Sequence, residues 1–282
     1  MNDKYLRSRF ITSKEELAKL GSEFNTEAFP LLSDLYKTTF YILLDKKQTK
    51  KIILQTYFET IQYCDVTKAH SDWWSWIHRI WMREIRDFYA SKENDINTIF
   101  DFIDFKKTDL TEVKTFFNQH VSGLRISESN FLDYLRKLPA VLRIPLIMKE
   151  VHSLGYEKIA ELIDVPFGVI ATRIFRARKL LYLFLSEDFD YEHQKKMSLT
   201  EKFEPIIFEV RKCALYADDE LNQVEKMEFK EKIKVDIKSE SELPIQEKIK
   251  ELLSILNFDS EKIRRIKRKI EKMAKKRFAK YI

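Results

Sequence analysis

Apolar residues recur at intervals of three or four along two long stretches of the chain. The first stretch, residues 24–90, offers Leu32 and Leu35 and later Phe58 and Ile61 at this spacing. Such a period places apolar side chains on one side of a helix and predicts a packed group of amphipathic helices.

The second stretch, residues 130–185, contains two shorter periodic segments separated by "DVPFG". The first segment predicts a helix over 156–163, and the second predicts a helix that begins near Pro166 or Phe167. Offsets of 0, 4, 7 and 11 place four apolar residues on one face of that second helix; they are Ile170, Ile174, Ala177 and Leu181. Ala160 is small enough to let two helices approach closely, so the pattern is typical of a helix-turn-helix.

Composition agrees with an all-helical chain, since only four glycines and six prolines occur among 282 residues. The expected fold class is all-α, with two small helical domains, a linker and a helical extension. We expect five parts: an N-terminal segment 1–23, a domain 24–90, a linker 91–129, a domain 130–185 and a C-terminal extension 186–282. Pro205 and Pro244 are expected to break the helices of the extension.

The charge is modest overall but uneven along the chain. Lys and Arg number 51 against 45 Asp and Glu, a net charge of +6. The stretch 165–181 holds four cations and no acid, which favours contact with phosphates. The last 23 residues hold 11 cations and two acids. An amphipathic helix with a solvated basic face is the simplest interpretation there, with nucleic-acid contact or an anionic membrane surface as alternatives.

Other signals narrow the class of protein. Cys64 and Cys213 lie far apart and form no disulfide or metal-ligand pattern, and no apolar run is long enough to span a membrane. We therefore expect a cytoplasmic protein with no membrane span. The five histidines accompany no nucleophile or phosphate-loop motif, so no enzymatic activity, catalytic residue, metal or cofactor is predicted.

The segment "LRKLPAVLRIPLIMKEVHSLGYEKIAELIDVPFGVIATRIFRARKLL" resembles the C-terminal DNA-binding region of sigma factors in the extracytoplasmic-function (ECF) group of the sigma-70 family. The resemblance implies −35 promoter recognition by the helix-turn-helix. Phosphates would also be met by the N-terminal amides of its second helix. The side chains implied in DNA contact are Thr172, Arg173, Arg176, Arg178 and Lys179.

The first domain resembles the other half of the same factors, which binds polymerase and melts the −10 element. "LQTYF" at 54–58 and "WIHRIWMREIRDFY" at 76–89 carry this resemblance. It implies Gln55 and Phe58 in polymerase binding. Aromatic rings and cations near an unpaired strand are a further expectation; the residues are Trp73, Trp74, Arg79, Arg83 and Arg86. For each tryptophan, packing in the core is the competing interpretation.

Several positions depart from the usual family residues. Ile52 replaces an acid near the polymerase motif, and Arg83 replaces an asparagine. Val169 and Ala171 replace a threonine and a basic residue in the second helix of the helix-turn-helix. These two changes predict an altered base preference.

The implied function is promoter recognition as a dissociable subunit of RNA polymerase, with core polymerase and promoter DNA as partners. A helix-turn-helix regulator that acts without polymerase, or a helical interaction scaffold, remains open. Residues 213–233 of the extension resemble the helical start of zinc-binding anti-sigma domains, but the zinc ligands are absent. We therefore hypothesise a regulatory extension, which makes the extension itself, or a separate anti-sigma factor, a further partner.

Overall fold

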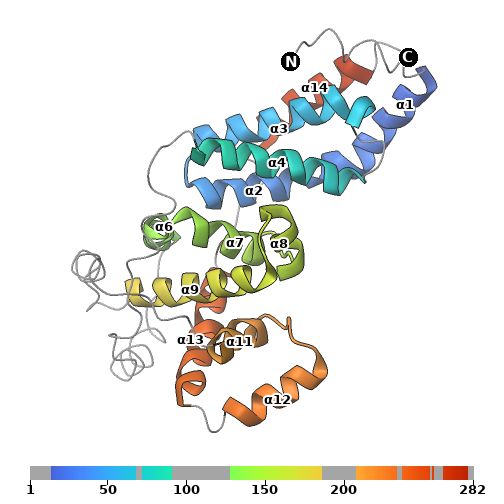
Figure 1. The fold of residues 1–282 in the computed structure, drawn as a ribbon. Helices are drawn as coiled ribbons and strands as arrows, with labels where there is room; N and C mark the ends of the chain where they lie inside the picture. Colours follow the sequence, from blue (N-terminus) through green and yellow to red (C-terminus); the bar gives the residue numbers. More distant parts are fainter. Residues whose placement is uncertain are drawn as a thin grey trace. The chain divides into compact units, whose positions relative to one another are not determined.

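The computed structural model describes residues 14–67, 72–90, 128–185, 208–233, 237–254, 256 and 263–278. The regular elements in these ranges are all helices, which confirms the predicted all-α class (Figure 1). The chain divides into two compact units, residues 1–91 with 258–282, and residues 92–257. Most of the expected linker, 91–127, lies outside the described residues.

Unit 1 is built around α3, which packs against α2, α4 and α14. A left-handed residue, Leu44, ends α2, where its backbone N–H donates to the carbonyl oxygen of Phe40. The elements of the unit are α1 (Lys14–Glu23), a π-helical turn (Phe24–Ala28), a 3-10 turn (Phe29–Leu31), α2 (Leu32–Leu43), α3 (Lys46–Thr67), α4 (Trp73–Ala90) and α14 (Arg264–Phe278).

Aromatic residues with polar ends connect the helices of unit 1. The Tyr57 hydroxyl donates to the carbonyl oxygen of Ala28 at 2.9 Å. The Trp81 indole N–H donates to the hydroxyl of Thr39 at 2.7 Å. Both aromatic side chains are fully buried, so each adds apolar area while its polar atom remains hydrogen-bonded.

The C-terminal helix α14 is an integral part of unit 1. Ile266, Ile270 and Phe278 are buried, at the spacing that predicted an apolar stripe. The Phe278 ring lies 5.7 Å from the ring of Phe24. A Cβ atom on Gly21 would lie only 3.0 Å from the Cβ of Phe278, so a larger residue at this position would require Phe278 to shift.

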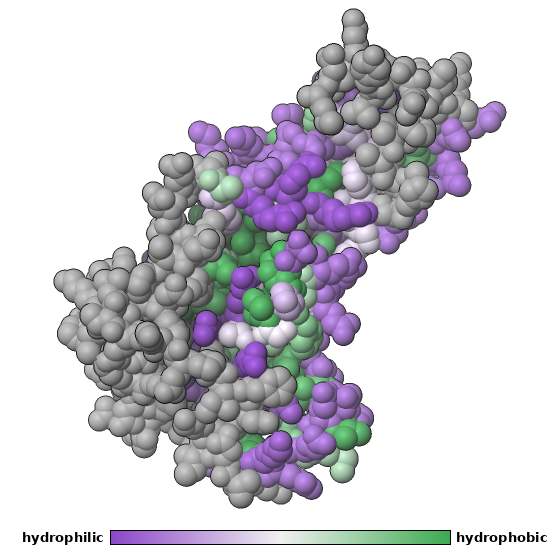
Figure 2. Space-filling model, in the orientation of Figure 1, coloured by the Kyte–Doolittle hydropathy of each residue, from purple (hydrophilic) through white to green (hydrophobic). Residues whose placement is uncertain are grey.

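The helices of the expected extension, residues 186–282, fall in both compact units. The apolar stripe of α14 is buried with α1 and α3, whereas α11–α13 pack with the helix-turn-helix. The extension is therefore shared between the two units. The face of the molecule drawn in Figure 2 shows mostly hydrophilic side chains over the described helices of unit 1.

Unit 2 has α9 at its centre, in contact with α6, α7 and α8 and also with α11 and α13 (Figure 1). Its helices are α6 (Glu128–Lys137), α7 (Ala140–Glu150), α8 (Tyr156–Ile163), α9 (Phe167–Leu185), α11 (Phe208–Ala217), α12 (Gln223–Ile233) and α13 (Ile237–Leu253). The expected break at Pro244 is wrong, because α13 continues through it. Ile245, Gln246 and Ile249 follow this proline and are buried, so tertiary packing holds the helix together there. Pro205 lies outside the described residues.

Candidate nucleic-acid interface

Helices α8 and α9 form the predicted helix-turn-helix. The turn consists of Asp164, Val165 and Pro166, and Asp164 adopts a left-handed backbone with φ 62°. The Val165 N–H donates to the carbonyl oxygen of Ala160 at 3.1 Å, and the Val169 N–H donates to that of Pro166 at 2.9 Å. The capped turn reverses the chain, and α9 begins at Phe167 as predicted.

The apolar face expected on α9 is present. Ile170, Ile174, Ala177 and Leu181 are each fully buried. On the preceding helices, the Arg143 guanidinium donates to the carbonyl oxygens of Leu135 and Leu138, both at 2.9 Å. Arg143 thus satisfies backbone acceptors at the end of α6, which gives the "LRKLPAVLR" segment a structural role.

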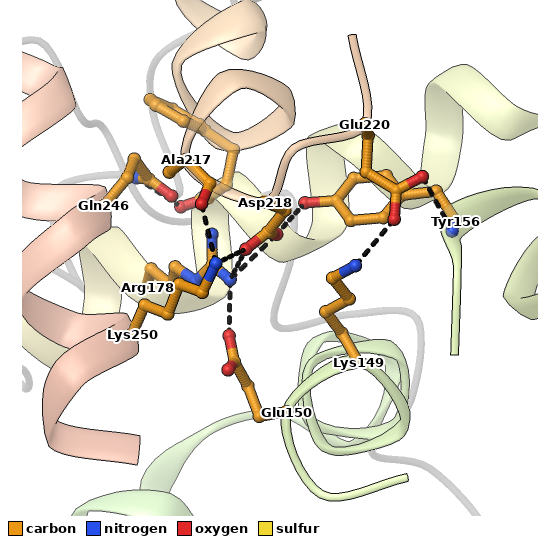
Figure 3. Close-up of polar contacts among 10 residues, drawn as sticks. Lys149, Glu150, Tyr156, Arg178, Ala217, Asp218, Glu220, Gln246 and Lys250 are labelled. Carbon is orange, nitrogen blue, oxygen red and sulfur yellow. Dashed lines mark hydrogen bonds and ion pairs between the residues drawn. The ribbon is translucent and has the colours of Figure 1, made fainter. Parts of the chain in front are cut away.

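Arg178 lies in a buried cluster of charges that joins α7, α8, α9 and the extension (Figure 3). One guanidinium nitrogen, Nη2, donates to both carboxylate oxygens of Asp218, at 2.7 and 2.8 Å, and to Glu150. The Tyr156 hydroxyl donates to Asp218 at 2.6 Å. The side chains of Arg178 and Asp218 are both 0% exposed, so in this conformation Arg178 reaches no DNA phosphate.

The ionisation of the cluster follows from burial and pairing. Burial alone would lower the pKa of Arg178, but the charges of Asp218 and Glu150 outweigh it and raise that pKa. Burial alone would raise the pKa of Asp218, but the charge and hydrogen bonds of Arg178, with the bond from Tyr156, hold it below its usual value. At Glu150 burial dominates and raises the pKa despite Arg178.

A second set of contacts runs along the outer side of α9. The Arg211 guanidinium donates to the Thr172 hydroxyl at 3.2 Å. Phe175 packs with Ala214 in a buried pair. Further along, the buried ammonium of Lys179 pairs with the buried carboxylate of Glu242. Thr172 and Lys179, two of the residues expected at DNA, therefore contact α11 and α13 instead.

The remaining expected DNA contacts on α9 are less covered. Arg173 and Arg176 are both half-buried, and burial lowers the pKa of Arg173. Phe167 and Gly168, in the first turn of α9, are exposed. The amide end of the helix and these two arginines thus lie closer to solvent than Arg178 does.

In unit 1 the expected residues fall into two groups. Trp73 is fully buried and donates its indole N–H to Glu23 at 3.1 Å, so in this conformation its ring offers no face to a base. Trp74 is half-buried and stacks on His78, with ring centroids 3.8 Å apart. Arg79 and Arg86 are exposed on the same helix.

The residues expected to bind polymerase are exposed on α3. The Phe58 side chain is 48% exposed, and Gln55 donates its amide N–H to Glu59 at 2.8 Å. Arg83 pairs with Glu59 as well, which joins α4 to this patch. Ile52, by contrast, is buried, so the departure there places an apolar residue in the core of unit 1.

Sequence reasoning did not anticipate the acids that engage α9. Asp218, Glu220 and Glu242 come from the extension, 40 or more positions away from the cations they meet. Asp218 and Glu242 pair with α9, and Glu220 pairs with Lys149 of α7 at 2.6 Å. The signal was the acidic run "ADDE" beginning at Ala217. Across the described residues, no group of His, Cys, Asp or Glu is arranged to hold a metal ion, and none of the helices is long and apolar enough to cross a membrane.

A short helix, a capped turn and a second helix with cations along it define a helix-turn-helix domain of the DNA-binding class. Comparison with known families agrees, since residues 129–181 match the model described as sigma-70, region 4. Residues 129–181 thus carry a sigma-70 region 4 domain, and the chain as a whole is similar to sigma factors of the extracytoplasmic-function group. Sigma factors, the proteins that the chain resembles, are not enzymes.

Two similar proteins illustrate the extent of the likeness. The "ECF RNA polymerase sigma-E factor" of Haemophilus influenzae is 24% identical over 176 residues, 59% of this chain and 92% of that protein. The protein of the same description from Salmonella typhimurium is 24% identical over 139 residues, 46% of this chain and 70% of its own length. A large part of the chain thus has no counterpart in these relatives.

Proposed function

We propose that this sigma factor binds core RNA polymerase in the cytoplasm and directs it to promoters, with −10 melting by unit 1 and −35 recognition by α9. The helix-turn-helix geometry within the region 4 match carries the proposal. Thr172, Arg173 and Arg176 are proposed to meet DNA, because they lie on the half of α9 nearest its exposed first turn.

The role of unit 1 is supported by the patch on α3. Phe58 is a large apolar side chain that is half exposed, and burying it against a partner would remove apolar area from water. Gln55, Glu59 and Arg83 surround it with polar groups. Such an anchor with a polar rim is the usual composition of a protein interface. Trp74, Arg79 and Arg86 are proposed to face the unpaired promoter strand.

Two alternatives make different use of these residues. A helix-turn-helix regulator that acts without polymerase has no need of the Phe58 patch. An interaction scaffold without DNA binding is suggested by Val169 and Ala171, and the burial of Ala171 under neighbouring helices favours it at that one position. Both alternatives predict that the protein does not direct core polymerase to promoters.

Reconstituted transcription tests the proposal. Purified protein is mixed with core RNA polymerase and genomic DNA fragments, and the start sites of the transcripts are sequenced. We expect a small set of start sites that share spaced sequence elements. Phe58→Ala should reduce this transcription and weaken co-purification with core polymerase, while Tyr63→Ala, a second exposed aromatic of α3, serves as a matched control. Equal start-site patterns with and without the protein would contradict the proposal.

We further propose that the part of the extension that packs on α9 regulates promoter access. Its support is the contact of α11 and α13 with Thr172 and Lys179. A separate anti-sigma factor would be a competing or additional partner, and the same transcription assay detects it as an inhibitor supplied in trans.

A further inference from the structure

The helices α11–α13, residues 208–253, form a layer that we call the α11–α13 layer. We infer that the α11–α13 layer occupies the DNA-facing side of α9 and that duplex DNA and the layer compete for that side. The inference rests on the proposed function and names the regulator, the surface it occupies and the groups it uses.

Besides the Arg178 pair, contacts of the layer fall on one stripe of α9. Gly168, Thr172, Phe175 and Lys179 are separated by four, three and four positions, the spacing of one helical face. Arg211 lies beside the first two, since a Cβ on Gly168 would lie 3.8 Å from its guanidinium and Thr172 accepts its hydrogen bond.

The other two positions of the stripe are covered by both helices of the layer. Phe175 packs with Ala214 of α11, and its carbonyl oxygen accepts a hydrogen bond from Gln246 of α13 at 3.3 Å. Lys179 pairs with Glu242 of α13. The stripe includes Thr172, a proposed base contact, so a major groove cannot reach this side of α9 while the layer is in place.

The layer uses carboxylates where DNA would use phosphates. Glu242 pairs with Lys179, Asp218 pairs with Arg178, and Glu220 pairs with Lys149. Each of these cations belongs to the helix-turn-helix domain. An acidic surface that neutralises the cations of a DNA-binding domain lowers its attraction for the phosphate backbone as well as blocking the groove.

Buried anchors hold the layer in place. Asp218 accepts hydrogen bonds from Arg178 and Tyr156, and Lys250 of α13 reaches both Asp218 at 3.3 Å and the carbonyl oxygen of Ala217 at 2.7 Å (Figure 3). The layer is therefore closed by a small number of specific contacts at the end of α11. If DNA binds only when the layer is displaced, its apparent Kd equals the intrinsic Kd divided by the fraction of molecules that are open.

The test compares duplex binding by full-length variants, with a fluorescent random-sequence duplex as the probe. Asp218→Asn removes the anchoring charge, and Asp219→Asn, at the adjacent exposed residue that pairs with Lys226, makes the same charge change outside the cluster. We expect Asp218→Asn to tighten duplex binding by about tenfold or more relative to Asp219→Asn. Equal affinities in two folded variants would overturn the inference.

A second variant, Arg211→Ala, tests the inference if Asp218→Asn fails to fold. Its expected effect on duplex affinity is opposite to the effect of simply losing a positive charge. Arg211→Ala removes a cation, which should weaken DNA binding unless Arg211 holds the layer over Thr172. Lys230→Ala, at an exposed position of α12, is the matched control. We expect Arg211→Ala to bind the duplex several-fold more tightly than the control. Equal or weaker binding would overturn the inference.

Arg173→Ala, added to the Arg211→Ala background, separates this inference from the proposed function. If Arg173→Ala removes the affinity that Arg211→Ala gained, α9 is supported as the surface that the layer uncovers. If Arg211→Ala gains nothing while Arg173→Ala still weakens binding, the layer does not compete with DNA and the proposed function stands. If Arg173→Ala and Arg176→Ala leave duplex binding and its salt dependence unchanged in every background, the proposed function itself fails.

Discussion

Two pieces of the same extension pack on the two units in opposite ways. Helix α14 buries an apolar stripe in unit 1 and keeps its cations, nine Lys and Arg against one Glu, on its other faces. The α11–α13 layer instead brings buried acids to the cations of α9. The first kind of contact depends on shape and apolar area, and the second depends on pairing charges that a polyanion could take over.

Only one of these two contacts can serve as a switch. A duplex offers phosphates to Lys179 and Arg178 but nothing to the apolar face of α14, so only the charged contact is open to competition by DNA. The apolar contact of α14 should persist when DNA binds.

The largest effect is expected at the anchor of the layer. Arg178→Ala would leave the buried carboxylate of Asp218 without its main partner, and we expect unit 2 to lose about 3–5 kcal/mol of stability. Arg173→Ala, at a half-buried arginine of the same helix, should cost less than about 1 kcal/mol. Denaturant unfolding of the two variants checks this. Similar unfolding midpoints would show that the Arg178 cluster is not an anchor.

The apolar contact of α14 is tested by Phe278→Ala. Loss of the buried ring beside Phe24 and Gly21 should destabilise unit 1 by about 3 kcal/mol or more. Phe58→Ala makes the same chemical change at an exposed site and should cost no more than about 0.5 kcal/mol. Thermal unfolding followed in the tryptophan signal reports on this unit, since Trp73 and Trp81 lie in its core. If Phe278→Ala unfolds at the same temperature as the native chain, α14 does not contribute to the core of unit 1.

A smaller effect is expected on the salt dependence of DNA binding. In a variant with the layer loosened, Arg173→Ala should reduce the slope of log K against log salt by about one, the value for one lost phosphate contact. Lys158→Ala on α8, which pairs with exposed Glu161, provides a comparison at a cation outside α9. A slope that changes equally in both would place the phosphate contact elsewhere.

The smallest effect concerns pH. The pKa of Asp218 is lowered in the folded state, so its contribution to stability is complete above its ordinary value of 3.8 and is lost as pH falls through the lower folded value. The charged and titratable groups facing it are Lys149, Glu150, Tyr156, Arg178 and Lys250.

Glu150 acts in the opposite sense, because its raised pKa disfavours the ionised form in the folded state. Well above its ordinary pKa of 3.8, Asp218 is ionised in both the folded and the unfolded state, so its contribution to the closure of the layer should be constant between about pH 6 and 8. The free energy of unfolding of the native chain and of Asp218→Asn, measured across that pH range, tests this expectation. A steep change near neutral pH in the difference between the two proteins would assign the pH dependence to a group other than Asp218.

The parts predicted well from sequence are those set by local rules. The boundaries of α8 and α9 follow from the Pro and Asp of the turn, and the buried face of α9 follows from its apolar period. Such features depend on residues within a few positions of each other.

The parts that sequence reasoning missed depend on distant partners. Whether Arg178 meets a phosphate or a carboxylate is decided by Asp218, 40 positions later. The buried state of Trp73 depends on Phe24 and Glu23, and the place of α14 depends on Gly21. A basic helix looks the same in sequence whether its cations face solvent, DNA or a neighbouring acid.

The most direct test of the central claim is hydrogen exchange of the full-length protein with and without duplex DNA, at a DNA concentration that saturates binding. If DNA displaces the α11–α13 layer, the amides of 208–217 and 237–253 should exchange faster in the complex while those of α9 become protected. The amides of α14 should remain unchanged, because its apolar contact is not open to competition. DNA binding that leaves α11 and α13 equally or more protected would contradict the account.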